Sequence, residues 1–101
     1  MNDDELRVLV YQNTSDPAAV TGAYHTVSRR LAGVPGLLGN ELLQSTVDST
    51  GFVVVSRWSG LAAFQEWEQG ADHRDATAAL RPFQDRRHGS PFGVYRVTAR
   101  Y

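Results

Sequence analysis

Hydrophobic residues follow two different periods along this chain, and the short-period segments predict four strands. The segments 6–12 and 52–58, LRVLVYQ and FVVVSRW, are apolar and rich in β-branched or aromatic residues, which is typical of strands. Segment 37–45 is predicted as another strand. The short polar turn 46–51 joins it to 52–58, so these two strands should form an antiparallel hairpin. A last strand is predicted over 92–101.

The helical period begins after the first strand. Asp16 can cap a helix and Pro17 suits its first turn. Apolar residues then recur at helical spacing from Val20 to Val34, which predicts one amphipathic helix. The sequence GVPGLLG at 33–39 should end this helix, because glycine and proline are costly inside one.

A second helical region follows the strand 52–58. Ser59 is expected to cap a short helix that runs through Gln69 and ends at glycine. Asp72 is expected to cap a further helix that runs to about Arg81, where Pro82 should stop it.

This order of elements, β-α-β-β-α(α)-β, predicts an α+β, ferredoxin-like domain over residues 1–101 with a four-stranded antiparallel sheet. In such a domain the helices cover one face of the sheet. The strand 52–58 nevertheless carries apolar residues on both faces. The second face should also include the apolar residues Leu9, Tyr11, Tyr95 and Val97. An apolar sheet face without helices is an association surface, so we expect a homodimer that closes sheet to sheet.

Composition narrows the choice of partners and compartment. Ten basic and eleven acidic residues give a net charge of −1 without a basic stripe, so nucleic acid is not an expected partner. The chain has no cysteine, which excludes disulfides and thiolate chemistry. It has no apolar run of about 18 residues, so no membrane span is expected. The acidic start MNDDELRV is unlike a signal peptide, and we expect a cytoplasmic protein.

Recognisable cofactor motifs are absent. The histidines and carboxylates show no metal-ligand spacing, and the chain has neither a phosphate-binding loop nor a nucleophile elbow. Chemistry-bearing residues gather instead in one stretch, RWSGLAAFQEWEQGADHRD at 57–75, which holds both tryptophans and His73.

Two segments carry a family resemblance, VPGLLGNELLQS after the first helix and FVVVSRWSGLAAFQEWEQGADHR from the hairpin onward. Pro35 and Gly36 lead into a strand, Trp58 ends the next strand, Phe64 lies six residues beyond it, and His73 begins a later helix. In this order and spacing the chain resembles the antibiotic biosynthesis monooxygenase family of dimeric α+β barrels.

The resemblance implies several activities, because fold alone does not choose among them. Some members of the family are cofactor-free oxygenases that convert aromatic polyketide anthrones to quinones, and others degrade haem or act on quinols. Our leading prediction is a cofactor-independent monooxygenase, with molecular oxygen as co-substrate and a small aromatic substrate. The alternatives are a non-oxidative polyketide cyclase and a non-catalytic ligand-binding dimer.

Trp58 and Phe64 are predicted as walls of a substrate pocket. Trp58 resembles the strand-end tryptophan of anthrone-oxidising members, where a flat ring wall and an indole N–H serve the substrate. It shares a strand face with Val54 and Ser56, which are predicted to contact substrate. The alternative is that Trp58 only fills the core.

Trp67 matches in spacing the tryptophan of the haem-degrading branch. That branch also needs a histidine where this chain has Thr77, and an asparagine that falls near Val8. Haem is therefore not expected, and Trp67 is predicted as a core or pocket-wall residue.

His73 is the candidate general base. After the expected cap Asp72 it should feel the positive end of a helix, which favours the neutral imidazole that a base needs. The alternative is a solvated surface histidine. His25 and His88 are less favoured, since one lies beside the apolar stripe of the first helix and the other in a polar loop.

Arg81 is the candidate donor to a phenolate or peroxide oxygen, although the position of the family's arginine falls on Ala79. The alternative is a cation that only closes the C-terminal end of its helix. The chain departs from the anthrone-oxidising pattern in two further places. Phe64 replaces a tyrosine, and Val54 replaces an asparagine. Tyr24, on the apolar stripe of the first helix, is the candidate substitute for the lost hydroxyl, and the alternative is a tyrosine that only fills the core.

Overall fold

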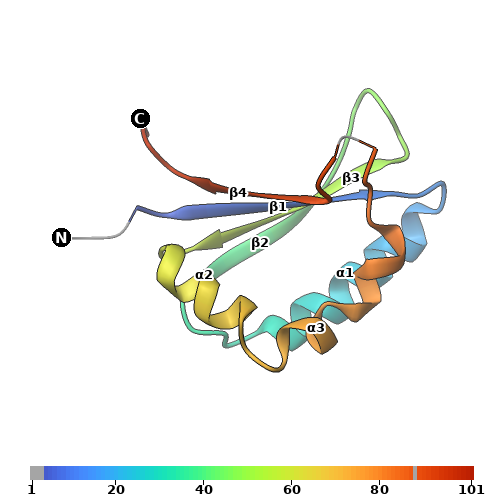
Figure 1. Ribbon diagram of the computed structural model, residues 1–101. Helices are drawn as coiled ribbons and strands as arrows, with labels where there is room; N and C mark the ends of the chain where they lie inside the picture. Colours follow the sequence, from blue (N-terminus) through green and yellow to red (C-terminus); the bar gives the residue numbers. More distant parts are fainter. Residues whose placement is uncertain (1–3, 88) are drawn as a thin grey trace.

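The computed structural model describes residues 4–87 and 89–101 and has two layers, an antiparallel sheet and a layer of helices on one side of it (Figure 1). The strands are β1 (Leu6–Asn13), β2 (Leu37–Gln44), β3 (Gly51–Trp58) and β4 (Phe92–Arg96). Their order across the sheet is β2-β3-β1-β4, with every neighbouring pair antiparallel. The predicted ferredoxin-like fold is confirmed. Within the described ranges, no helix has the length and apolar character needed to cross a bilayer.

The first helix, α1 (Pro17–Leu31), begins as predicted. The Asp16 carboxylate accepts a hydrogen bond from the Ala19 backbone N–H at 3.2 Å, and Pro17 occupies the first turn. The helix ends three residues before the predicted Val34, because the chain turns at Gly33 with a φ of 85°, a conformation that favours glycine.

A glycine also sets the distance between β2 and the next helix, α2 (Leu61–Glu68). Gly36 has a φ of 84°, and a Cβ at this position would collide with the Ala63 side chain. Its carbonyl accepts a hydrogen bond from the Ser59 N–H at 2.8 Å. Gly36, just before β2, therefore lets α2 pack closely against the end of the sheet.

The predicted helix from Asp72 to Arg81 is wrong in its form. The segment is instead a short helix α3 (His73–Ala76) followed by a 3₁₀-helix η1 (Ala78–Phe83) that includes Pro82. In a continuous α-helix the ring of Pro82 would clash with a carbonyl one turn back. At the break, the Thr77 hydroxyl donates to the His73 carbonyl at 2.9 Å.

Two predicted caps are also corrected. The residue that caps α2 is Gly60 rather than Ser59, and it makes no side-chain capping bond. Asp72 does precede α3, but its carboxylate makes no capping bond either. We expected the positive end of a helix dipole at His73, but only a single turn of α-helix follows this residue and contributes to that dipole.

The last strand is shorter than the predicted 92–101. β4 pairs with β1 from the Val10↔Phe92 pair to the Leu6↔Arg96 pair. One more hydrogen bond joins the Val97 N–H to the Glu5 carbonyl at 2.8 Å. Beyond that point β1 offers no further described partner, so the chain leaves the sheet.

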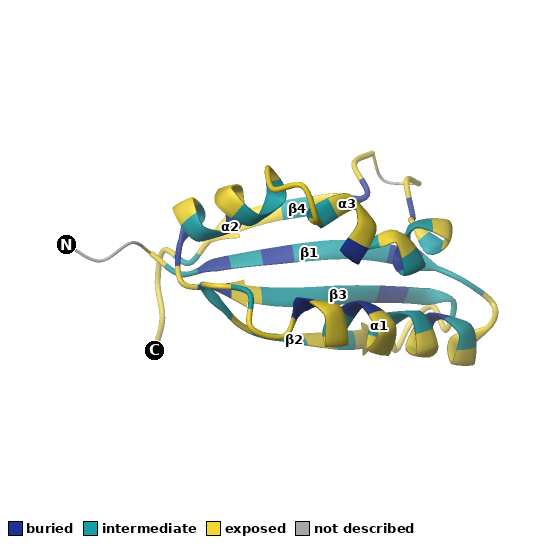
Figure 2. Ribbon diagram, turned by 90° about the horizontal axis from the view of Figure 1, so that it is seen from below, coloured by how far each residue is buried: buried dark blue, intermediate teal, exposed yellow. Residues whose placement is uncertain are grey.

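The helix-facing side of the sheet carries the core (Figure 2). Alternate residues of β1 and β3 are buried against the helices: Leu6, Val8, Phe52 and Trp58. Trp58 is the most enclosed of these, with only 1% of its surface exposed. They pack with buried residues of the helical layer: Val20, Val27, Leu31, Phe64, Ala76 and Leu80.

On the opposite side of the sheet, called the outer face below, none of the helices in residues 4–87 and 89–101 lies over the strands (Figure 1). Its apolar residues come from all four strands, and they are Leu9, Tyr11, Leu43, Val53, Val55 and Tyr95. Leu43 and Tyr95 are 43% and 54% exposed. Val97, predicted to join this face, lies just beyond the end of β4.

Candidate active site

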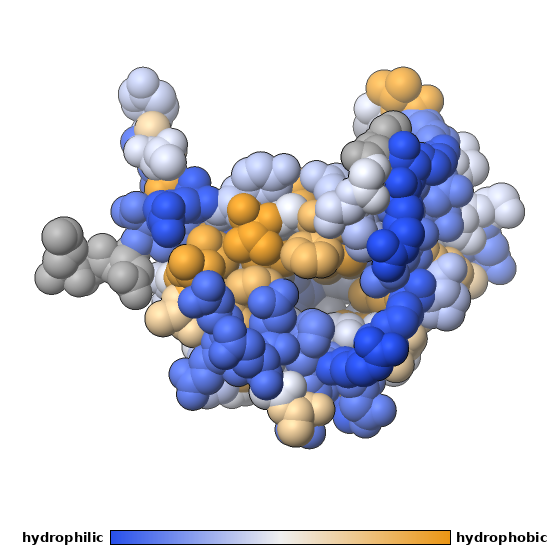
Figure 3. Space-filling view, in the orientation of Figure 1, coloured by the Kyte–Doolittle hydropathy of each residue, from blue (hydrophilic) through white to orange (hydrophobic). Residues whose placement is uncertain are grey.

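A cavity of about 380 Å³ lies between the sheet and the helices, of the size and apolar character usual for small-molecule sites. Figure 3 shows it as a hollow beneath β4, with hydrophobic residues along its upper rim and hydrophilic residues below. Phe92 of β4 lies at the mouth and is 44% exposed.

All eight residues that the sequence singled out line this cavity: Tyr24, Val54, Ser56, Trp58, Phe64, Trp67, His73 and Arg81. They come from α1, β3, α2, α3 and η1, so the fold brings together residues up to 57 positions apart in the chain. Their individual roles stay predictions. His25 is exposed on α1 and lies outside the cavity lining, and His88 falls outside the described residues.

Three aromatic side chains form one wall. The Trp58 and Phe64 rings meet edge to face with centroids 5.4 Å apart, and the Trp67 ring lies 5.4 Å from Trp58. Trp58 and Phe64 are buried, while Trp67 is partly exposed. Core and pocket wall are therefore the same residues: Trp58 and Phe64 fill the interior and present one ring side to the cavity.

We expected the Trp58 indole N–H to serve the substrate, but it bonds to a neighbouring side chain instead. It donates to the Ser56 hydroxyl, with 2.9 Å between Nε1 and Oγ. Because the indole is committed to this bond, the donor that this part of the wall presents is the Ser56 hydroxyl, two residues earlier on the same strand face.

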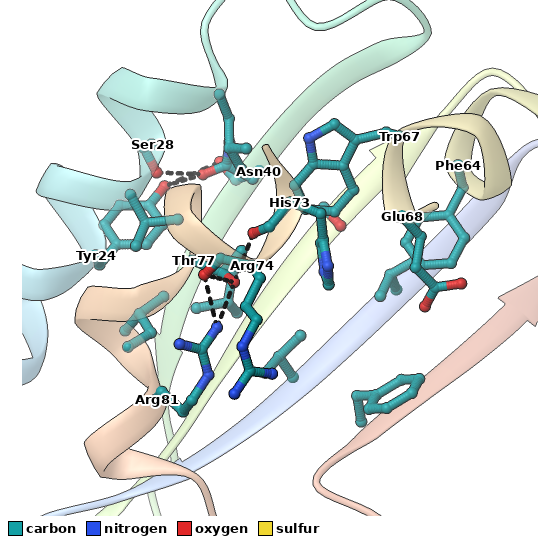
Figure 4. A pocket seen from close by; sticks show the side chains of 18 of the residues that line it. Tyr24, Ser28, Asn40, Phe64, Trp67, Glu68, His73, Arg74, Thr77 and Arg81 are labelled. Carbon is teal, nitrogen blue, oxygen red and sulfur yellow. Dashed lines mark hydrogen bonds between the residues drawn. The ribbon is translucent and has the colours of Figure 1, made fainter. Parts of the chain in front are cut away.

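His73 stands against the aromatic wall. Its ring meets Trp67 edge to face, with centroids 4.5 Å apart, and lies beside it in Figure 4. Burial lowers the pKa of His73 below its ordinary value of about 6.5. The Glu68 carboxylate opposes this shift, while Arg81 and Arg74 add to it. Burial therefore favours the neutral imidazole, the form that can accept a proton.

Arg81 is held by the break between α3 and η1. One of its guanidinium nitrogens, Nη2, donates to the Arg74 carbonyl at 2.7 Å and to the Thr77 hydroxyl at 3.2 Å (Figure 4). The guanidinium is half-buried on the cavity wall, and its other N–H groups have no acceptor within the described ranges. Arg81 can therefore donate to a ligand oxygen from a fixed position.

The sequence missed a polar group at the far wall. Asn40 of β2 lines the cavity, and its carboxamide oxygen accepts from the Tyr24 and Ser28 hydroxyls of α1 (Figure 4). The Tyr24 hydroxyl, predicted to serve the substrate, is thus bonded to Asn40. The available signal was an asparagine inside a strand, where this residue is uncommon.

Glu68 and Arg74 were also missed, and both line the cavity. They lie at helix positions near the aromatic and histidine residues, but charged residues there are usually solvated, so no pattern distinguished them. Within residues 4–87 and 89–101, no group of three or more histidine and acidic side chains is placed to hold a metal ion.

Comparison with known proteins identifies the family. The model of the antibiotic biosynthesis monooxygenase family matches residues 14–79. Protein SchA of Streptomyces halstedii is 32% identical over 82 residues, which cover 81% of this chain and 22% of SchA. The 42.8 kDa protein in the whiE locus of Streptomyces coelicolor is 30% identical over 76 residues, which cover 75% of this chain and 19% of that protein. The chain thus spans about a fifth of the length of these curated relatives.

Solved structures agree on the fold. The N63A mutant of SnoaB, a cofactor-independent oxygenase from Streptomyces nogalater, superimposes with a TM-score of 0.78 at 18% identity, covering 97% of this chain and 96% of SnoaB. At this identity the likeness supports the fold alone. Together with the family match over residues 14–79, it leads to one conclusion: the chain belongs to the antibiotic biosynthesis monooxygenase family.

Proposed function

We propose that this chain is a cofactor-independent monooxygenase that oxidises an aromatic polyketide-type anthrone or phenol to a quinone. The observation that carries the proposal is the position of His73, whose ring meets Trp67 in the wall of a largely apolar cavity and whose pKa is lowered by burial. The likeness to SnoaB, itself a cofactor-independent oxygenase, and the family match are consistent with this chemistry.

The first step is removal of a proton. An anthrone has an acidic CH₂ group across the central ring from its carbonyl. His73 takes one proton from this carbon and becomes imidazolium, and the electron pair spreads into the ring as an enolate. Apolar surroundings favour the step only if the anion's oxygen meets donors, since an unpaired charge in such a site is costly.

Oxygen reacts in the next steps. The enolate passes one electron to O₂, which yields a substrate radical and superoxide and avoids the spin barrier to direct reaction. The pair recombines at the deprotonated carbon, and His73 returns its proton to form a hydroperoxide. Loss of the second hydrogen from that carbon, with cleavage of the O–O bond, gives the carbonyl and one water. One O₂ is consumed for each quinone and water formed.

The other cavity residues divide into walls and donors. Trp58, Phe64 and Trp67 would flank the ring system, and Val54 would lie beneath it. Arg81, held by Thr77 and the Arg74 carbonyl, would donate to the peroxide oxygen. The reaction is then promoted by orientation, deprotonation and charge stabilisation rather than by a bound cofactor.

We also propose that two copies associate through the outer face. This surface is apolar at its centre, with Leu43 and Tyr95 substantially exposed, and charged at its margin, where Arg7, Glu41 and Arg57 lie. The β2–β3 turn and the C-terminal residues rise beside it on the side away from the helices (Figure 1). A large apolar sheet face of this kind supports self-association.

Oxygen uptake with a synthetic anthrone tests the proposal. We expect one O₂ consumed per quinone formed, in protein stripped of metals with a chelator and free of flavin absorbance. Product without oxygen consumption would support the non-oxidative cyclase. Tight binding of the anthrone without any product would support a ligand-binding dimer. Either of these results contradicts the oxygenase.

A further inference from the structure

A line of polar side chains crosses the otherwise apolar floor of the cavity. The Trp58 indole donates to the Ser56 hydroxyl on β3. Ser56 is directly paired with Asn40 on β2, and both side chains line the cavity. Asn40 in turn accepts from Tyr24 and Ser28 of α1. The residues around this line are apolar: Val8, Val10, Val27, Leu31, Val54 and Leu80.

The hydrogen bonds from α1 fix which way the Asn40 carboxamide faces. The Tyr24 hydroxyl lies 2.5 Å from Oδ1, a distance that suits an O–H···O bond and is too short for N–H···O. The Ser28 hydroxyl donates to the same oxygen at 3.0 Å. With Oδ1 bound to both hydroxyls, the Asn40 NH₂ group is the end of the carboxamide that remains available.

Ser56 presents a donor for a similar reason. Its oxygen already accepts from the Trp58 indole at 2.9 Å, so its own proton is directed to a different partner. Directly opposite residues on antiparallel strands have their Cβ atoms about 5 Å apart. Within the described part of the chain, neither the Ser56 hydroxyl proton nor the Asn40 NH₂ group has a protein acceptor. The floor therefore offers two adjacent donors.

We infer that Ser56 and Asn40 form a two-donor site for the ring carbonyl of a fused-ring ligand. Trp58 positions the serine, and Tyr24 and Ser28 position the amide. In the catalytic setting, which rests on the proposed function, this carbonyl oxygen is the one that gains charge when His73 deprotonates the ring. The two donors would then serve substrate selection and anion stabilisation together, and Tyr24 would act as a positioning residue rather than a substrate contact.

Such a site distinguishes ligands with a ring carbonyl from those without one, because a ligand without a carbonyl leaves the two donors unpaired. A ring of the same shape without a carbonyl would enclose both donors in an apolar cavity with no acceptor, which costs more than the lost bond alone. We therefore expect the cavity to prefer ring ketones over their methylene analogues.

Acridone and 9,10-dihydroacridine test this preference, because they share a tricyclic shape and differ in the ring carbonyl. Acridone does not need to react, so the test is independent of oxidation. We expect wild-type protein to bind acridone roughly tenfold more tightly than the methylene analogue. We also expect the infrared carbonyl stretch of bound acridone to lie below its position in an apolar solvent, because accepted hydrogen bonds weaken the C=O bond.

Variants separate the two donors from general packing. Asn40→Leu keeps the side-chain size, and it should weaken acridone binding about three- to tenfold and raise the carbonyl stretch. Ser56→Ala should act in the same direction, and the double variant should bind both tricyclic compounds equally. Asn13→Leu makes the same change on β1 outside the cavity lining and should leave both readouts unchanged.

The positioning role has its own readout. Tyr24→Phe combined with Ser28→Ala keeps the Asn40 donor but frees its amide to rotate. The carbonyl stretch should broaden and move toward the value of Asn40→Leu, with a smaller loss of affinity. Equal binding of both compounds by wild-type protein, or a carbonyl stretch indifferent to Asn40→Leu, would overturn the inference. Acridone binding as expected without anthrone oxidation would instead refute the oxygenase and leave the donor site standing.

Discussion

The two faces of the sheet are built from the same strands and differ in almost every physical respect. On β3, Trp58 faces the helices with 1% of its surface exposed. On the same strand Val53 and Val55 face away from them, beside Leu43 and Tyr95, which are 43% and 54% exposed. Strand alternation alone divides these residues between the two sides. One strand thus supplies a pocket floor and part of the surface through which we propose that two copies associate.

The chemistry of the faces differs as well. The helix side combines apolar walls with a few polar groups in fixed positions: Asn40, Ser56, His73 and Arg81. The outer face is apolar at its centre, and Arg7, Glu41 and Arg57 lie toward its margin. If the helix side serves catalysis and the outer face serves assembly, substitutions at neighbouring positions of one strand should separate the two properties.

The largest expected effect is the loss of turnover in His73→Ala. Removal of a general base typically costs about 10²- to 10⁴-fold in rate, and the variant should remain folded because His73 is only partly buried. Initial rates of oxygen uptake with anthrone measure the effect. His25→Ala is the matched control on exposed α1 surface and should keep the wild-type rate. Full activity in both His73→Ala and Trp58→Phe would show that the site is wrongly assigned.

The outer face should respond in assembly rather than in chemistry. Val55→Asp would place a carboxylate at the centre of the proposed dimer surface, and its desolvation should weaken the dimer at least about 100-fold. Sedimentation velocity over a concentration series measures this. Val54→Ala, one residue earlier on the helix side, should leave the dimer constant unchanged. A Val55→Asp protein with the wild-type association constant would exclude the outer face as the interface.

Most of the fold could be predicted because its signals are local. Strand alternation, the Asp16 cap and the turn glycines each act within a few residues, and the order of strands and helices followed from them. The prediction was wrong between Asp72 and Pro82, where the segment is a short α-helix followed by a 3₁₀-helix that includes the proline. Helical periodicity does not distinguish a continuous α-helix from a short α-helix followed by a 3₁₀-helix, which is the form found before Pro82.

The sequence predicted which residues line the candidate site better than it predicted how their side chains are oriented and bonded. Aromatic residues and a histidine at family spacing located the cavity wall. Asn40 was missed because β2 has a register irregularity between Leu37 and Gly39. The irregularity brings Leu37 and Asn40 to the same face, although they lie three residues apart, which simple alternation forbids. The bonding of the Trp58 indole to Ser56 likewise depends on side-chain rotamers, which no sequence pattern encodes.

Substitutions on the two faces should also differ in their effect on the free energy of unfolding, and this effect is smaller than those on turnover and dimerisation. Trp58→Phe would leave space in the core and release the Ser56 bond, with a loss in free energy of unfolding of about 1–3 kcal/mol. Urea unfolding followed by far-UV circular dichroism measures this. Arg57→Gln, on the outer face one residue earlier, should change stability by no more than about 0.5 kcal/mol. A Trp58→Phe protein as stable as wild type would mean that the indole packs less tightly than its burial indicates.

The smallest expected effect is a shift in the pH dependence of oxidation. As a base, His73 works when neutral, so kcat/KM should rise with pH through a midpoint below the ordinary imidazole value of about 6.5. The Glu68 carboxylate favours the imidazolium, and Glu68→Gln should therefore move the midpoint to lower pH. Arg81 disfavours the imidazolium, and Arg81→Gln should move the midpoint to higher pH, although the oxidation rate of this variant will fall as well.

Both shifts should shrink in high salt, because these charges lie near the surface. Glu66 also lies on α2 but outside the cavity lining, so Glu66→Gln should leave the midpoint of the pH profile unchanged. A midpoint that ignores Glu68 and Arg81 alike would mean that the titrating base is a group other than His73.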